Sequence, residues 1–116
     1  MPGLSTMQSI TQIDPDVLRS SADAACRLLK ALSNPDRLLL LCHLAQGEMR
    51  VGELEAMTGV LQPTLSQQLS VLRDEGLVST RRDGKSIYYS IDSPQALAVM
   101  AVLYEQFCGN TKGKKA

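Results

Sequence analysis

Residues 51–91 read VGELEAMTGVLQPTLSQQLSVLRDEGLVSTRRDGKSIYYSI, and the order of patterns in this stretch decides the fold. A brief helical pattern over residues 52–57 stops at the breaker Thr58-Gly59. Gln62-Pro63 then opens a second helical pattern, which turns its leucines to one side and ends near Glu75-Gly76. A short helix, a glycine-containing turn and a second helix are typical of a helix-turn-helix motif.

A β-hairpin is predicted directly after the second helix. Residues 77–82 and 87–91 are rich in β-forming side chains and flank Asp83-Gly84, which is a strong signal for a tight hairpin turn. A helix-turn-helix followed by a hairpin is the element order of a winged helix-turn-helix domain. We therefore expect a mainly α fold with a β-hairpin wing.

Two helices are predicted before this stretch and one after it. Asp14-Pro15 and Asn34-Pro35 each read as an N-cap followed by a proline in the first helical turn. The second of these helices is expected to stop at Gly47, because glycine supplies the left-handed backbone that ends many helices. Asp92-Ser93-Pro94 starts the last helix, and Gly109 is its expected end.

The chain reads as one domain over residues 14–109, between a disordered N-terminal segment (1–13) and a basic, flexible tail (110–116). Within the domain, residues 48–51 are too few to form more than an edge strand. No apolar run approaches the roughly 20 residues of a membrane span, and the N-terminus lacks the basic start and apolar stretch of a secretory signal. We therefore expect a cytoplasmic protein that has no membrane partner.

The composition excludes several classes of protein. Three cysteines without a CxxC motif argue against a disulfide framework. With a single histidine, His43, they are too few and too scattered for a zinc finger. The chain also lacks a paired acidic site, a phosphate-binding loop and a nucleophile–base constellation, so we expect neither an enzyme nor a bound cofactor.

The second helix of the motif and the wing carry side chains suited to DNA. The helix contains no acid over residues 62–70, and a recognition helix of this kind enters the major groove. Hydroxyls, amides and cations can contact phosphates or read base edges. The candidate DNA-binding residues are Gln62, Thr64, Ser66, Gln67, Ser70, Arg81, Arg82 and Lys85. Taken singly, the helix face is also compatible with an ordinary solvated surface, and the wing with a charged edge that resists aggregation.

The stretch Leu32–Leu38 resembles the L-x-x-P-x-R-L signature of the ArsR/SmtB family of repressors. Residues 51–54, 62–69, 72–78 and 81–89 extend this resemblance in unbroken register, so that it covers about residues 15–108. It implies a homodimer whose first and last helices form the interface. It also implies repression by occupancy of an inverted-repeat operator, with release by an inducer.

The metal sites known in this family have no counterpart here. The positions that match the cysteines of the recognition-region site are Arg50 and Gly52. The positions that match the last-helix zinc site retain Asp92 and carry Pro94, Glu105 and Cys108 in place of the other ligands. We therefore expect no metal site.

The cysteines fit a different subgroup. Cys42 in the second helix and Cys108 at the end of the last helix resemble the cysteine pair of BigR- and SqrR-type repressors, which respond to reactive sulfur species or oxidants. The resemblance implies that a crosslink between Cys42 and Cys108 releases the operator. From helical periodicity alone, both side chains are also compatible with core packing, as is Cys26.

Two further functions stay open at this point. One is a metal-responsive repressor that uses Cys42, Cys108 and His43. The other is a protein–protein adaptor built on the winged-helix fold.

Overall fold

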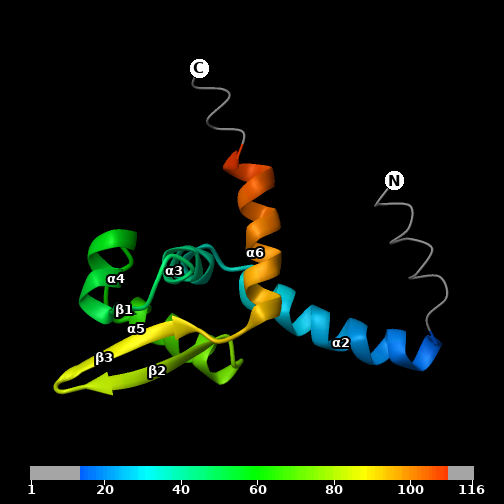
Figure 1. Ribbon diagram of the computed structural model, residues 1–116, viewed down its shortest axis with the longest axis horizontal. Helices are drawn as coiled ribbons and strands as arrows, with labels where there is room; N and C mark the ends of the chain where they lie inside the picture. Colours follow the sequence, from blue (N-terminus) through cyan, green and yellow to red (C-terminus); the bar gives the residue numbers. More distant parts are fainter. Residues whose placement is uncertain (1–13, 110–116) are drawn as a thin grey trace. The chain divides into compact units, whose positions relative to one another are not determined.

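The computed structural model describes residues 14–109, and two units, residues up to 30 and residues from 31 onward, are described separately. The expectations for residues 1–13 and 110–116 lie outside the described residues. The elements are α2 (Pro15–Leu32), α3 (Pro35–Leu44), β1 (Met49–Arg50), α4 (Val51–Thr58), α5 (Thr64–Asp74), β2 (Val78–Asp83), β3 (Ser86–Ile91) and α6 (Pro94–Phe107), as Figure 1 shows. This order is the expected one, and the winged helix-turn-helix fold is confirmed. No helix among the described residues is both long and apolar enough to span a membrane.

Side-chain caps start the helices where the sequence places them. Asn34 Oδ1 accepts a hydrogen bond from the backbone N–H of Arg37 at 3.0 Å, at the start of α3. Ser93 Oγ accepts from the N–H of Ala96 at 3.1 Å, at the start of α6. Each cap satisfies a backbone donor that the first helical turn would otherwise leave without a partner.

Gly47 and Gly109, the expected ends of two helices, lie three and two residues beyond the last helical residue. Helix α3 ends at Leu44, with Ala45 as a right-handed C-cap, and Gly47 follows two residues later in the connection to β1. Helix α6 ends at Phe107, and Cys108 caps it by donating its N–H to the carbonyl oxygen of Tyr104 at 2.7 Å. In both cases a right-handed residue ends the helix, so no left-handed glycine is needed at the cap.

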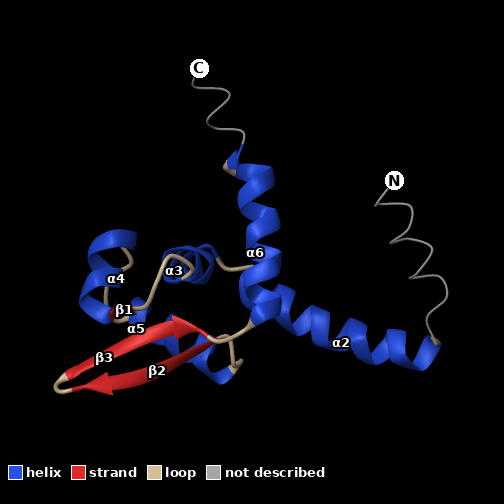
Figure 2. Cartoon of the chain, viewed as in Figure 1, coloured by secondary structure: helices blue, strands red, loops and turns tan. Residues whose placement is uncertain are grey.

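The three strands form an antiparallel sheet in the order β1-β3-β2, and Figure 2 shows the two longer strands as one hairpin between α5 and α6. Asp83 pairs with Ser86 as the last rung of the hairpin ladder. The turn is therefore Gly84-Lys85, one residue later than the expected Asp83-Gly84. Gly84 has φ +64° and takes the first central position, where a type II′ turn requires glycine.

A leucine core holds this unit together. Helix α3 packs against α4 and α5, α4 packs against β1 and β3, and α5 packs against β2. The largest fully buried side chains are all leucines: Leu40, Leu41, Leu54, Leu65, Leu69 and Leu72. Three of these lie on α5, so one face of that helix is fixed inward and the opposite face is left at the surface.

Candidate nucleic-acid interface and thiol site

The surface of α5 carries the polar side chains that the sequence singles out. Ser66, Gln67 and Ser70 are exposed, and Thr64 is half-buried in the first turn. No acidic residue lies in this turn, so its backbone N–H groups face a surface that favours anions. Gln62, just before the helix, is already engaged, because its Oε1 accepts a hydrogen bond from the N–H of Ser66 at 3.0 Å.

One further arginine ties α5 to the rest of the unit. The Arg37 guanidinium donates from Nε to the carbonyl oxygen of Ala31 at 2.6 Å and from one terminal nitrogen to Gln68 Oε1 at 2.8 Å. Arg37 therefore joins the backbone at Ala31, near the end of α2, to α5. Gln68 points to this bond, whereas its neighbour Gln67 is exposed.

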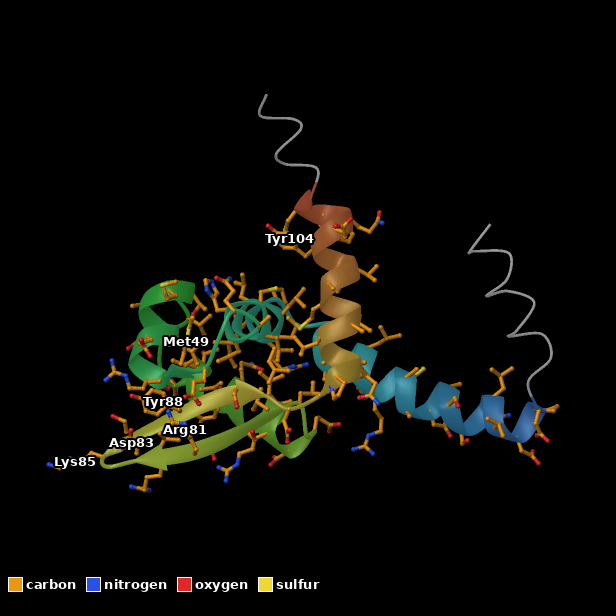
Figure 3. All side chains as sticks on the ribbon, in the orientation of Figure 1. Met49, Arg81, Asp83, Lys85, Tyr88 and Tyr104 are labelled. Carbon is orange, nitrogen blue, oxygen red and sulfur yellow. The ribbon has the colours of Figure 1, made fainter. Side chains whose placement is uncertain are left out.

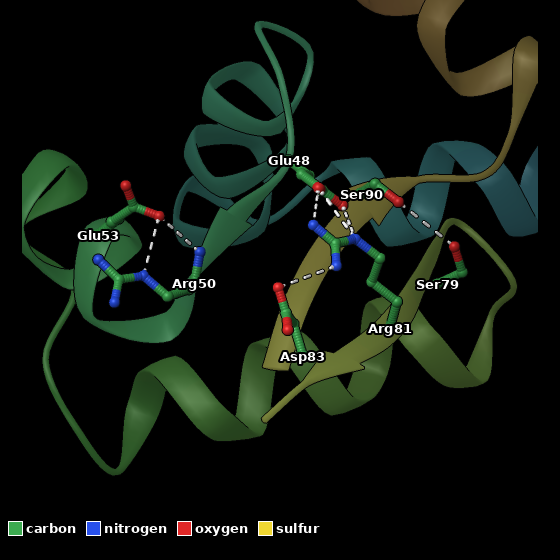
Figure 4. Close-up of polar contacts among 7 residues, drawn as sticks. All are labelled: Glu48, Arg50, Glu53, Ser79, Arg81, Asp83 and Ser90. Carbon is green, nitrogen blue, oxygen red and sulfur yellow. Dashed lines mark hydrogen bonds and ion pairs between the residues drawn. The ribbon is translucent and has the colours of Figure 1, made fainter. Parts of the chain in front are cut away.

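Arg81 on the wing is held by its own chain. It donates from Nε to both carboxylate oxygens of Glu48 at 3.0 Å and makes a further short contact from a terminal nitrogen, as Figure 4 shows. Its guanidinium lies 4.5 Å from the ring centroid of Tyr88, and its second terminal nitrogen lies 3.9 Å from Asp83 Oδ2. These contacts neutralise Arg81 and join the wing to the residue before β1.

The electrostatics of this pair follow from the geometry. The side-chain hydrogen bonds from Arg81 lower the pKa of the Glu48 carboxyl, and the same bonds raise the pKa of Arg81. At the start of α4, the backbone N–H of Arg50 donates to Glu53 Oε1 at 2.9 Å, and this bond lowers the pKa of Glu53. Both carboxylates are therefore held in their charged form.

Unlike Arg81, Arg82 and Lys85 are not held by an ion pair within the part of the chain that the structure describes. Both side chains are exposed, and neither has an ion-pair partner among residues 14–109. Arg82 follows Arg81 in β2 and so points to the opposite face of the sheet. Lys85 lies in the turn at the tip of the hairpin (Figure 3). Their charges are available to a partner.

The cysteines lie at the surface instead of in the core. Cys42, Cys108 and Cys26 are all exposed, so the core-packing interpretation of these residues is wrong. On α3 the buried positions around Cys42 are Leu40, Leu41 and Leu44. These three leucines form the buried face of α3, on which helical periodicity alone would also have allowed Cys42.

Cys42 lies within electrostatic range of Cys108. Partial burial raises the pKa of the Cys42 thiol, and the negative charge of a Cys108 thiolate raises it further. The second effect links the sulfur on α3 with the one that caps α6. The fold therefore places within electrostatic range two residues that are 66 positions apart, since 108 minus 42 is 66.

His43, next to Cys42, has a buried Nδ1 atom for which the described residues supply no hydrogen-bond partner. Among residues 14–109, no three His, Cys, Asp or Glu side chains gather in a way that could hold a metal ion.

Comparisons with known proteins agree with this geometry. The profile of the bacterial regulatory protein, ArsR family, matches residues 34–80. The biofilm growth-associated repressor of Agrobacterium fabrum is 48% identical over 99 residues, 85% of this chain and 85% of the relative. Its namesake from Xylella fastidiosa strain 9a5c is 47% identical over 95 residues, 82% of this chain and 83% of the relative. The chain belongs to the ArsR family.

Solved ArsR-family relatives share the fold as well. The crystal structure of the transcriptional repressor BigR from Xylella fastidiosa matches with a TM-score of 0.77 at 46% identity, and the match covers 83% of this chain and 98% of that one. Reduced HlyU from Vibrio cholerae matches with a TM-score of 0.75 at 36% identity, over 78% of this chain and 96% of that one. The resemblance noted in the sequence is confirmed at the level of family and fold.

The bonds of Arg37 to Gln68 and of Glu48 to Arg81 were not predicted from the sequence of this ArsR-family chain. Arg37 belongs to the L-x-x-P-x-R-L signature, and that signature is the only signal that could have drawn attention to it. Its partner Gln68 is 31 residues away, and Glu48 is 33 residues from Arg81. Contacts over such separations depend on how the helices and strands pack.

The Glu48–Arg81 pair predicts a specific titration behaviour. A free glutamate titrates near pH 4.3, and Glu48 should titrate below that value in the folded chain. The stability that the pair contributes is therefore complete above about pH 4.3 and is lost as the pH falls through the lower, folded pKa. Carbon-detected NMR of the side-chain carboxyl groups measures this titration directly.

The Arg81→Gln variant should return the Glu48 titration to about 4.3. Glu53 is the internal control, because its pKa is lowered by the Arg50 amide and should stay low in the same variant. A Glu48 titration that is identical with and without Arg81 would show that the pair does not form in solution.

Proposed function

We propose that the chain is a transcriptional repressor that binds operator DNA through α5 and the wing. The observation that carries this proposal is the division of α5 into two faces. Leu65, Leu69 and Leu72 are buried, and the opposite face carries exposed hydroxyls and amides with no acid over residues 62–70. The name repressor, printed for the relatives from Xylella fastidiosa and Agrobacterium fabrum, supports the direction of regulation.

The candidate residues take different roles in this proposal. Gln67 and Ser70 face the major groove, where an amide can pair with adenine. Gln62, Thr64 and Ser66 surround the helix N-terminus and position it on a phosphate. Arg82 and Lys85 contact the backbone or minor groove from the wing. Arg81, already paired with Glu48, supports the wing from within the protein.

We further propose that two copies of the chain bind an inverted-repeat operator together. Helix α2 exposes Val17, Leu18 and Leu29, and α6 exposes Val102, Tyr104 and Phe107, the last at 78%. Large apolar side chains at this density mark an interface. A two-fold dimer presents two recognition helices to two half-sites, so symmetry in the operator mirrors symmetry in the protein.

Replacement of Gln67 by alanine tests the recognition helix. The variant should lose roughly 5- to 150-fold in operator affinity, because a good side-chain-to-base pair is worth about 1–3 kcal/mol of discrimination. Affinity for unrelated duplex DNA should stay at the parental value. Gln46→Ala, at an exposed position between α3 and β1, is the matched control. If Gln67→Ala binds the operator as tightly as the parent, Gln67 does not contribute to recognition of the operator bases.

Replacement of Arg82 by glutamine tests the wing. Affinity should fall for operator and unrelated DNA alike, and the slope of log K against log salt should decrease by about 0.9 for the one lost phosphate contact. The double variant Glu48→Gln, Arg81→Gln removes one charge of each sign from the internal pair and should keep the parental slope. Binding that keeps its full salt dependence without Arg82 would exclude the wing from the DNA contact.

Release of the DNA depends on the two exposed thiols, Cys42 and Cys108. We propose that an organic persulfide, RSSH, oxidises Cys42 and Cys108 to a crosslink. In the first step a cysteine thiolate attacks the outer sulfur of RSSH, which forms a protein persulfide and expels the thiol RSH. In the second step the other thiolate attacks the protein-bound sulfur, closes a disulfide and expels hydrogen sulfide. Two thiols and RSSH thus yield one disulfide, RSH and H₂S.

The crosslink has a physical route to the DNA-binding surface. Cys42 lies on α3, which ends at Leu44, and Glu48 follows in the connection to β1. Glu48 holds Arg81, and Arg37 at the other end of α3 holds Gln68 on α5. A shift of α3 toward α6 would therefore act on the wing and on the recognition helix at the same time.

Replacement of Cys108 by serine tests the switch. The variant should bind the operator as the parent does and should not release it when an organic persulfide is added. Intact mass spectrometry of the parent should show loss of two hydrogens for a disulfide, or added sulfur for a longer bridge. Cys26→Ser is the matched control and should release the operator as the parent does when the persulfide is added. Persulfide-driven release from Cys108→Ser would refute the two-cysteine switch.

A further inference from the structure

A pocket lies beside Cys42, between α3 and α6. It has a volume of about 570 Å³ and is lined from α3 by Cys42 and Gln46 and from α6 by Leu97, Met100 and Glu105, among others. This volume falls in the range of small-molecule sites. Figure 3 shows Tyr104, another lining residue, projecting from α6.

The walls of this pocket are mostly apolar. Its apolar lining residues are Leu97, Met100, Ala45 and Ala101, and Leu97 is 42% exposed. An apolar group that fills the pocket removes this surface from water, and the hydrophobic effect favours that burial. The pocket therefore prefers a compound with a hydrocarbon body.

The charge of the lining selects further. Glu105 is the one carboxylic acid in the wall, and no lysine, arginine or histidine lines the pocket. A carboxylate repels anions at close range, and no cation in the wall compensates this repulsion. Anionic compounds are disfavoured at the position where they would meet the Cys42 sulfur.

We propose that this pocket is the entry site for the sulfur compound that reacts with Cys42, and that it selects neutral, apolar organic persulfides over anionic ones. The inference rests on the proposed thiol switch and adds to it the class of compound that the switch accepts. The compound places its hydrocarbon body against Leu97 and Met100, and its outer sulfur meets Cys42.

The state of the Cys42 thiol suits such selection. Partial burial raises its pKa, so near neutral pH the group rests as the unreactive thiol. Reagents that meet it only by random collision react slowly. A compound that is held in the pocket stays beside the thiol through many brief deprotonations, so binding increases its reaction rate.

Methanethiosulfonates with different tails test this selection, because all of them deliver a sulfur by the same reaction. The thiolate attacks the sulfenyl sulfur, forms a mixed disulfide and expels methanesulfinate. The protein is the full chain with Cys26→Ser and Cys108→Ser, which leaves Cys42 as the single thiol. The benzyl, trimethylammonioethyl and sulfonatoethyl reagents are compared, each rate being divided by its rate with a small free thiol.

The normalised rate should be highest for the neutral benzyl reagent and lowest for the anionic sulfonatoethyl reagent. Glu105→Gln should raise the rate of the anionic reagent about fivefold, the effect of one carboxylate at close range in water. Leu97→Gln should slow the benzyl reagent alone. Asp92→Asn, which removes an exposed acid outside the pocket, is the matched control and should change none of the rates.

Equal normalised rates for all three reagents, or rates that ignore Glu105→Gln and Leu97→Gln, would overturn the inference. Operator release by benzyl persulfide from the chain with all its cysteines is measured separately. Selective labelling of Cys42 without operator release would refute the thiol switch and leave the pocket in place. Release without selectivity would keep the switch and refute the pocket.

Discussion

Burial of the leucines on α5 is the constraint on which the rest of the structure depends. Leu65, Leu69 and Leu72 are at most 1% exposed, and full burial of each such side chain contributes about 1.5–3 kcal/mol. A rotation of α5 about its axis would bring these side chains into water. The same packing therefore determines which side chains α5 presents at the surface. Stability of the core and orientation of the proposed DNA-binding face are therefore set by the same packing.

Two arginines add polar contacts outside the leucine core, one to α5 and one between the wing and Glu48. Arg37 bonds Gln68 on α5 and the carbonyl oxygen of Ala31, so it joins α5 to the backbone near the end of α2. Arg81 bonds Glu48 and lies over Tyr88, so it holds the wing to β1. The Arg37 bonds are part-buried and the Arg81–Glu48 pair is exposed, and exposed ion pairs are weak compared with leucine burial. Contacts of this strength can be altered by a modest shift of α3.

The thiol site combines features that favour a slow, selective reaction. Cys42 is accessible, yet its surroundings disfavour the thiolate, and a Cys108 thiolate disfavours it further. The proposed crosslink between the two thiols removes this repulsion. The apolar wall of Leu97 and Met100 lies beside Cys42, so in the proposed switch a compound is recognised where it reacts.

By itself, the sequence determined the element order, the two helix starts at Asn34 and Ser93, and the inward leucines of α5, because these depend on residues within a turn or two of one another. Only the tertiary structure decided the pairing of Arg37 with Gln68 and of Arg81 with Glu48, and the exposure of Cys42. The hairpin turn is Gly84-Lys85, one residue later than the predicted Asp83-Gly84, because Asp83 pairs with Ser86 in the sheet. Such contacts depend on packing between distant segments, and local patterns carry no information on which side chains that packing brings together.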